Sequence, residues 1–130
     1  MVKTSGVVDS HELTGLHEIA DRYPDYVVWL EAAGDRAIWW PIPDLHAPIL
    51  AAMIPFADRL AGLLRAGDDV VLHCGAGIGR AGTTAACTLI RLGLSEHDAL
   101  AAVTAARPMA GPEVGPQRDL VAAIAELGGG

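Results

Sequence analysis

Residues 73–83 read HCGAGIGRAGT, and this stretch decides the fold. The apolar residues 70–72 precede it and a helical pattern over 80–92 follows it, so the sequence predicts a strand, a tight glycine-rich loop and a helix. Such a loop directs backbone N–H groups and a helix N-terminus at one spot, which makes an anion-binding site. Cys74, at the floor of that site, is expected to ionise easily because the same dipoles stabilise its thiolate. Arg80 can hold two phosphate oxygens with its planar guanidinium.

Three other interpretations fit parts of this stretch. Residues 77–82 read GIGRAG and match the dinucleotide-binding fingerprint. That fingerprint expects an acidic residue about 20 residues later, where residues 101–104 read AAVT. Residues 77–84 imitate a P-loop but lack its lysine. A glycine-rich turn around a buried free cysteine is also compatible with the pattern, but it leaves the charge of Arg80 without a role.

The composition describes a soluble globular protein. The 130 residues are 52% hydrophobic and 19% charged, which predicts one domain over 1–130. The net charge of −7 argues against nucleic acid or an anionic membrane as a partner. Two cysteines form no secreted disulfide framework, and no stretch has the length and composition of a membrane span. We therefore expect a cytoplasmic monomer.

Periodicity and chain breakers divide the sequence into alternating strands and helices. The predicted strands lie at 7–8, 26–30, 37–40 and 69–73. The predicted helices lie at 10–23, 48–64, 80–92, 96–107 and 116–126, and the glycines 128–130 form a frayed tail. This alternation predicts a single α/β domain with a mainly parallel central sheet flanked by helices. The glycine-rich loop then lies at the carboxyl end of a central strand, where open sheets bind ligands.

The stretch resembles the signature loop of the cysteine-dependent protein tyrosine phosphatase superfamily, and most closely that of a compact dual-specificity-type phosphatase. That pattern is His-Cys, five residues, Arg, then Ser or Thr, then Gly. The positions that fit it are His73, Cys74, Ala76, Gly77, Gly79, Arg80 and Gly82. Ala81 departs from it, because the family usually has a hydroxyl there. The resemblance extends from about Tyr26 to Gln117.

The resemblance implies a phosphomonoester hydrolase that acts through a phosphocysteine intermediate. Phosphotyrosine is the implied substrate, with phosphoserine and phosphothreonine as further candidates, in a phosphorylated protein or a small phosphomonoester. Cys74 would be the nucleophile, and His73 would order the loop around it. The implied phosphate-binding residues are Gly75, Ala76, Gly77, Ile78, Gly79 and Arg80. The mechanism implies no cofactor and no metal.

The leaving group needs a proton, so a carboxylic acid should approach from a second loop. Residues 41–44 read PIPD and resemble the general-acid loop of the dual-specificity branch, which makes Asp44 the candidate acid. A turn or helix-capping aspartate in a proline-rich loop is the alternative. His46 could be a substitute acid or a substrate contact, or simply an exposed loop histidine.

Gln117 is similar in placement to a glutamine that positions the attacking water in some family members, and a solvated first-turn glutamine is the alternative. Ala81 removes a hydroxyl that helps the cysteine leave, although Thr83 and Thr84 are close in sequence and could replace it. Slow turnover by a phosphate-binding pseudophosphatase or adaptor is therefore a second hypothesis. A sulfur transferase or arsenate reductase is a third, against which the histidine before the cysteine and the aspartate loop argue. Cys87 is predicted to pack in the core.

Overall fold

The computed structural model describes residues 2–3, 10–11, 38–39, 46–68, 70–73 and 79–127. The strands in these ranges are β1 (Val2–Lys3), β2 (Ser10–His11), β3 (Ile38–Trp39) and β4 (Val70–His73). The helices in these ranges are α3 (Leu50–Arg65), α4 (Gly79–Arg91), α5 (Glu96–Ala106) and α6 (Gly115–Leu127).

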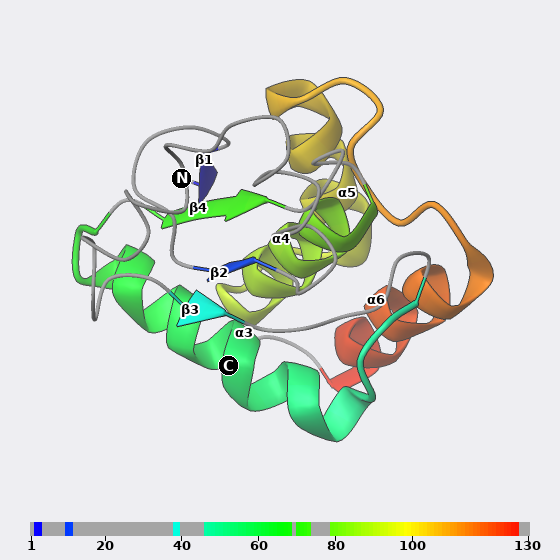
Figure 1. Cartoon of the computed structure of the whole chain (residues 1–130), viewed down its shortest axis with the longest axis horizontal. Coiled ribbons are helices and arrows are strands. Elements are labelled where there is room, and N and C mark those ends of the chain that lie inside the picture. The colour runs from blue at the N-terminus through cyan, green and yellow to red at the C-terminus, as the bar shows by residue number, and fades with distance from the viewer. Residues whose placement is uncertain are drawn as a thin grey trace.

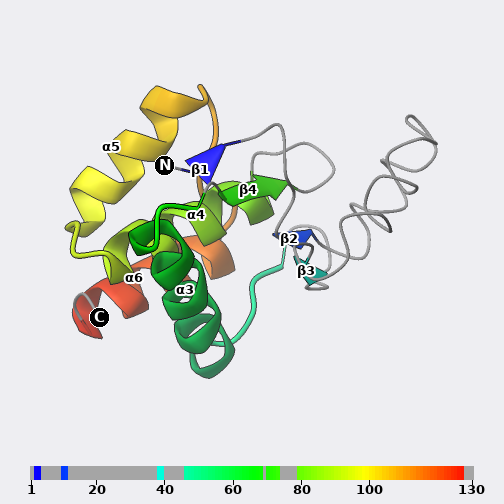
Figure 2. The same cartoon turned by 90° about the vertical axis from the view of Figure 1, so that its left-hand side faces the viewer.

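The described strands pair in the order β1-β4-β2-β3, and every pair among them is parallel. In the register of these pairs, Val2 lies opposite Val70 and His11 lies opposite His73. β4 therefore has a neighbouring strand on each side. Figure 2 shows the four labelled helices grouped on one side of β2 and β3. The larger predicted sheet, with helices on both faces, stays a prediction.

The N-terminal region departs from the expected elements at two places. Ser10–His11 is a strand, whereas the sequence predicted a helix from residue 10, and the two-residue strand β1 was not predicted. Serine is a favoured helix N-cap, but β2 pairs with both β4 and β3, and such tertiary pairing overrides a local preference. The predicted strands at 7–8 and 26–30, and the tail at 128–130, lie outside the described residues.

The helices after residue 46 agree with the prediction to within two residues at their ends. Ser95 caps α5 as expected, because its Oγ accepts a hydrogen bond of 3.1 Å from the Asp98 N–H. Gly67 and Gly93 follow α3 and α4 with φ of 92° and 113°, in the left-handed region that glycine enters without strain. α3 continues through Pro55 as one helix.

α4 occupies the centre of the described structure (Figure 1) and contacts β4 and the other three helices. All but two of its residues are buried, which small residues allow because they let neighbouring segments approach closely. Its Thr84 and Thr88 hydroxyls donate to the carbonyls of Arg80 and Thr84 at 2.9 and 2.8 Å, so these buried polar groups are satisfied within the helix. Its own Ile90 is fully buried, and the largest fully buried apolar side chains from other elements are Met53, Leu60, Val70, Val121 and Ile124.

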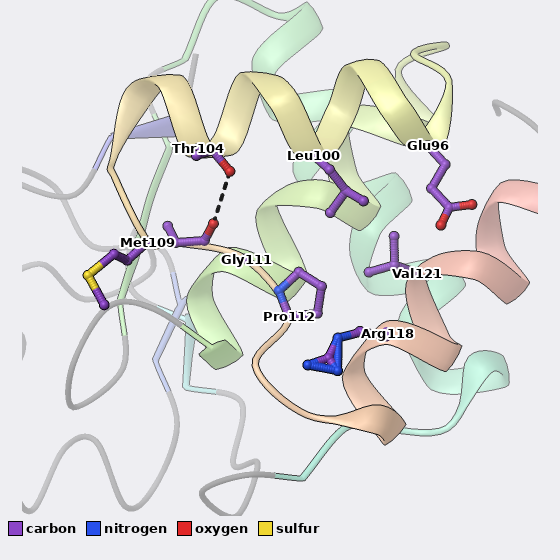
Figure 3. A pocket seen from close by; sticks show the side chains of 9 residues that line it. Glu96, Leu100, Thr104, Met109, Gly111, Pro112, Arg118 and Val121 are labelled. Atoms are coloured by element: carbon purple, nitrogen blue, oxygen red, sulfur yellow. Dashed lines mark hydrogen bonds between the residues drawn. The ribbon is translucent and has the colours of Figure 1, made fainter.

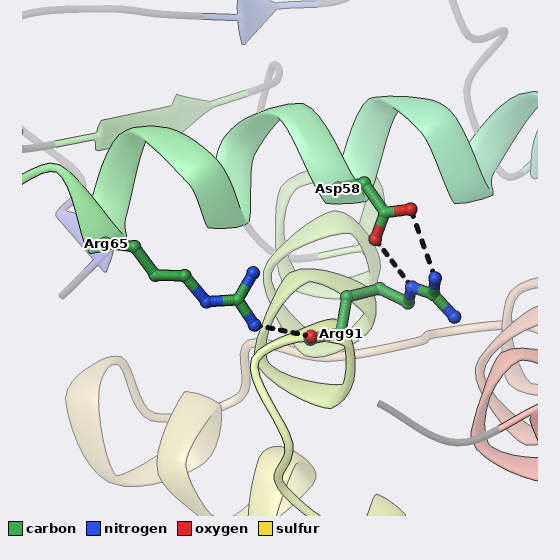
Figure 4. Close-up of polar contacts among 3 residues, drawn as sticks. All are labelled: Asp58, Arg65 and Arg91. Atoms are coloured by element: carbon green, nitrogen blue, oxygen red, sulfur yellow. Dashed lines mark hydrogen bonds and ion pairs between the residues drawn. The ribbon is translucent and has the colours of Figure 1, made fainter. Parts of the chain in front are cut away.

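An ion pair joins the carboxyl end of α4 to α3 (Figure 4). Arg91 donates from Nε and Nη2 to the two carboxylate oxygens of Asp58, at 2.6 and 3.1 Å, and Arg65 donates to the Arg91 carbonyl at 3.2 Å. The two-point geometry fixes orientation, but the Asp58 side chain is 42% exposed, so the pair contributes about 1 kcal/mol or less to stability.

Gly82 lies where α4 meets the 110–111 backbone. A Cβ at this position would lie 2.7 Å from the Gly111 Cα and 3.1 Å from the Ala110 carbonyl carbon, and closer still to the Gly111 nitrogen. The two backbones are therefore in direct contact, and this contact sets the distance between α4 and the segment that leads into α6.

Gly82→Ala is therefore expected to lower the free energy of unfolding by about 2–3 kcal/mol, since overpacking against backbone cannot be relieved by a rotamer change. Gly62→Ala is the matched control, because a Cβ there meets nothing within 4 Å. Within α3 that change should stabilise the protein by about 0.5–1 kcal/mol. Urea denaturation of both variants measures the two effects, and equal effects of the same sign would contradict the close contact at Gly82.

Candidate active site

The backbone around the glycine-rich loop has the predicted form. β4 ends at His73 and α4 begins at Gly79, and β4 has a strand on each side. The connection therefore starts at the carboxyl end of an interior parallel strand and finishes at a helix N-terminus, where unpaired N–H groups and the helix dipole favour an anion. Cys74 and the predicted phosphate-binding residues at 75–78 lie outside the described residues.

Arg80 occupies the first turn of α4 and is 4% exposed. An arginine keeps its charge in a protein, so burial at this depth requires compensating polar groups around it. A buried cation at the opening of the helix adds to the positive potential of the helix N-terminus. The site can therefore attract and hold a dianionic group such as a phosphate ester.

Glu113 covers the start of α4, which the sequence did not indicate. A Cβ at Gly79 would lie 3.0 Å from the Glu113 Cδ and 3.1 Å from its Cγ, with the carboxylate oxygen Oε1 closer still. Gly79 thus makes room for this side chain, and the carboxylate lies beside the positive end of the helix, where a negative group is stabilising. The glutamate follows a Gly-Pro pair in an irregular segment, and no local pattern marked it as part of a site.

Gln117 lies near the beginning of α6 and is 1% exposed, so the solvated alternative is wrong. Its Oε1 accepts a hydrogen bond of 2.8 Å from the Glu113 N–H, and its Nε2 donates one of 3.1 Å to the His46 carbonyl. The carboxamide therefore joins two backbone segments 67 residues apart, at positions 46 and 113. Sequence reasoning placed Gln117 near the reaction but had no means of finding these partners.

The predicted general acid Asp44 lies outside the described residues, and the described chain resumes at His46. The His46 side chain is exposed, as one of the alternatives for it predicted. From His46 the chain runs through Ala47 and Pro48 into α3, which starts at Leu50. The segment after the predicted acid is thus attached to α6 through its backbone and leads directly into a packed helix.

The two threonines that could replace the missing hydroxyl at position 81 differ in their hydrogen bonding. Ala81 is 5% exposed, so position 81 is buried and apolar. The Thr84 hydroxyl is committed to the Arg80 carbonyl. The Thr83 Oγ1, in contrast, is buried without a hydrogen-bond partner in the described part of the chain. Thr83 is therefore the better candidate for a compensating donor.

Cys87 is fully buried in α4 among apolar side chains, as predicted, and carries a free thiol. Burial raises the pKa of Cys87 from 9.0 to about 12, because the apolar surroundings disfavour the thiolate. The Cys87 thiol is therefore unsuited to be a nucleophile, since a nucleophilic cysteine must ionise near neutral pH.

Iodoacetamide at pH 7.5 is expected to label the native protein once, at Cys74, and to leave native Cys74→Ser unlabelled, whereas denatured wild type takes up two equivalents. The raised pKa of Cys87 also predicts that its contribution to the free energy of unfolding is constant below pH 9 and is lost as the pH rises toward 12. In that range the unfolded chain loses the thiol proton while the folded chain retains it. Mass spectrometry counts the labels. Labelling of Cys87 in the native serine variant would contradict its burial.

A half-open cavity lies between α5, α6 and the 109–112 segment (Figure 3), and its lining includes none of the predicted site residues. Met109 adopts a φ of 71° at its rim and is 79% exposed. Glu96 and Arg118 supply its charged side chains, and Arg118 donates to the Glu113 carbonyl at 2.8 Å. In the described ranges, no three His, Cys, Asp or Glu side chains gather in a way that could hold a metal ion. None of the described helices is long and apolar enough to cross a membrane.

A strand that ends at His73, a short glycine-rich connection that begins with Cys74, and a helix with a buried arginine in its first turn define a compact cysteine phosphatase of the dual-specificity type. Over residues 8–94 the chain matches the family Tc-R-P, described as a polymorphic toxin system DSP-PTPase phosphatase. The match spans well over half of the chain, and the chain belongs to this family. The resemblance inferred from the signature stretch is thereby confirmed.

Solved structures of phosphatases share the fold. The active form of Tk-PTP is 26% identical and superposes with a TM-score of 0.68, covering 94% of this chain and 93% of that one. Human DUSP28 is 25% identical with a TM-score of 0.64, covering 72% of this chain and 67% of that one. Kinase-associated phosphatase, with its catalytic-site cysteine replaced by serine, is 21% identical with a TM-score of 0.73 over 94% of this chain and 70% of its own. These likenesses confirm the α/β class, and no curated protein sequence matches at a significant level.

Proposed function

We propose that the protein hydrolyses phosphomonoesters through a phosphocysteine intermediate, with phosphotyrosine as substrate and phosphoserine or phosphothreonine as further candidates. The observation that carries the proposal is Arg80, a buried cation in the first turn of a helix that follows an interior strand through a cysteine-containing loop. An arginine in the first turn of a helix adds its charge to that of the helix N-terminus, and its planar guanidinium can hold two oxygens of an anion. Membership of a phosphatase family supplies the class of that anion.

In the proposed reaction, the Cys74 thiolate attacks phosphorus and forms a P–S bond while the P–O bond to the leaving group breaks. Asp44 gives its proton to the departing oxygen. Loop N–H groups and Arg80 hold the equatorial oxygens, where charge accumulates. Water then attacks phosphorus and forms a P–O bond while the P–S bond breaks, which releases inorganic phosphate and restores the thiolate. The Asp44 carboxylate takes the proton of the attacking water and is again the acid for the next turnover.

Hydrolysis of an aryl phosphate, measured with and without vanadate, tests this proposal. Vanadate resembles the five-coordinate phosphorus of the transition state and should inhibit at concentrations well below those of phosphate. Turnover that vanadate suppresses supports the phosphatase, whereas phosphate binding without turnover supports the second candidate. That second candidate is a phosphate-binding pseudophosphatase, which the buried apolar Ala81 favours.

Ala81→Ser is expected to raise the steady-state rate about 10-fold. A hydroxyl at position 81 can donate to the Cys74 thiolate as it leaves, and a hydrogen bond to a charged group is worth about 1.5–3 kcal/mol, of which about 1.4 corresponds to a factor of ten. Stopped-flow measurements should show a burst of aryl alcohol in wild type that shrinks in the serine variant.

Ala85→Ser is the matched control for this prediction. It makes the same chemical change one turn further along α4, at a position that is 7% exposed, and should leave turnover unchanged. If wild type shows no burst and Ala81→Ser turns over at the same rate, the donor is already supplied. The Thr83 hydroxyl, which has no hydrogen-bond partner among the described residues, is then the group to replace next.

A further inference from the structure

We propose that Gln117 is a positioning residue that holds the backbone next to Asp44 in register with the phosphate-binding loop, an inference that rests on the proposed function. In this role the Gln117 carboxamide does not contact the attacking water; it links backbone segments through its hydrogen bonds. The link joins three segments: the chain entering α3, the 110–114 segment, and the first turn of α6.

The hydrogen bonds of the Gln117 carboxamide are oriented by the chemistry of its partners. A backbone N–H can only donate and a carbonyl can only accept, so one orientation of the carboxamide satisfies both Glu113 and His46. The side chain is 1% exposed, and loss of either bond would leave a buried polar group unpaired. The two bonds are therefore strongly directional and costly to break.

One end of this link lies close to the predicted general acid. His46 follows Asp44 by two residues, and two residues of extended chain span about 7 Å at most. Fixing the His46 carbonyl therefore restricts where the Asp44 carboxyl can go. The His46 side chain is exposed, and the backbone carbonyl of this residue is the atom that accepts the hydrogen bond from Gln117.

The other end of the link lies at the phosphate-binding loop. The Glu113 N–H is held by Gln117, and the Glu113 side chain covers Gly79, where the loop enters α4. The His46 carbonyl is thus connected to the start of α4 through the buried amide of Gln117 and the side chain of Glu113. A general acid must lie within hydrogen-bond reach of the leaving oxygen, and a shift of about 1 Å can cost 10²-fold in rate.

The burial of Gln117 argues for this link over water positioning. A glutamine carboxamide has two N–H groups and two lone pairs, and here one of each is used by backbone partners. The remaining N–H and lone pair lie on a side chain that is 1% exposed. Holding the segment next to Asp44 would affect protonation of the leaving group, whereas positioning the water would affect hydrolysis of the phosphocysteine. Measurements of the two steps can therefore distinguish the two roles.

The experiment compares Gln117→Met with wild type on phenyl phosphate, whose leaving group needs protonation, and on 4-nitrophenyl phosphate, whose leaving group needs it less. We expect kcat/KM for phenyl phosphate to fall about 10- to 100-fold, the cost of a misplaced acid, and that for 4-nitrophenyl phosphate to fall less than about 3-fold. In an Asp44→Asn background, Gln117→Met should cause no further loss, because both changes remove the same proton transfer.

Leu120→Ala is the control for a merely structural role, since Leu120 is buried in the same helix and makes no polar link. It should lower the melting temperature while affecting both substrates equally. The proposal is wrong if Gln117→Met also affects both substrates equally, and a larger burst in that case assigns Gln117 to the attacking water. If the methionine variant does not fold, Gln117→Asn, which cannot span both partners, takes its place.

Hydrogen–deuterium exchange separates this proposal from the proposed function. Gln117→Met should accelerate exchange in peptides covering residues 40–49 about 10-fold, beyond the change that Leu120→Ala produces there through lower stability. Unchanged exchange would overturn the link whatever the enzyme does. A wild-type protein that hydrolyses neither substrate while showing the expected exchange overturns the proposed function and leaves the link supported.

Discussion

Cys74→Ser is expected to abolish hydrolysis of aryl phosphates and to retain the binding of phosphopeptides. A serine hydroxyl ionises far less readily than a thiol, so dipoles that would favour a thiolate are expected to give an alcohol little reactivity. The substitution leaves unchanged the loop N–H groups, the helix N-terminus and Arg80, which are the groups proposed to bind the phosphate. Steady-state rates and calorimetric binding of a phosphotyrosine peptide measure the two effects separately.

Cys87→Ala is the matched control, because it removes the other cysteine from a fully buried position in the core. It should leave the rate unchanged, at a modest cost in stability. A serine variant that retains activity near that of wild type would sink the covalent mechanism. Loss of both activity and phosphopeptide binding would instead mean that the substitution disturbs the loop itself.

Asp44→Asn is expected to lower turnover of phosphotyrosine by about 10²–10⁴, which is the usual contribution of a general acid. The loss should be much smaller for 4-nitrophenyl phosphate, because its phenolate leaves with little help from a proton. The asparagine keeps the size and polarity of the side chain, so the comparison isolates the proton. The rate profile of wild type should fall on the alkaline side as the acid deprotonates, and that limb should disappear in the variant.

Equal losses on the two substrates would mean that Asp44 has a structural role in the proline-rich loop. His46 would then be the next candidate for the acid, since its side chain is exposed two residues further on. The same pair of substrates serves the Gln117 experiment, so the two variants and their combination form one double-mutant cycle. A coupling equal to the smaller single effect would place both residues in the same step.

The helical half of the fold was predictable because its signals are local. Apolar periodicity, the Ser95 cap and the glycines after α3 and α4 are read from neighbouring residues, and α3 to α6 follow them to within two residues. The prediction of a helix from residue 10, where β2 lies, was wrong because it also relied on a local signal. Ser10 fits a helix N-cap, but its backbone pairs with strands that lie 28 and 62 residues further along the chain, at Ile38 and Leu72.

The sequence by itself determined the class of this protein. A cysteine, an arginine and three glycines in one strand–loop–helix stretch indicated the phosphatase family, because one short segment can bring a thiol, N–H groups and a cation to one point. Only the tertiary structure decided what surrounds that point. The contact of Gly82 with the 110–111 backbone, the glutamate over Gly79 and the amide of Gln117 join residues from separate segments. Their partners are set by how α4 and α6 pack, and packing between distant segments leaves no periodic trace in the sequence.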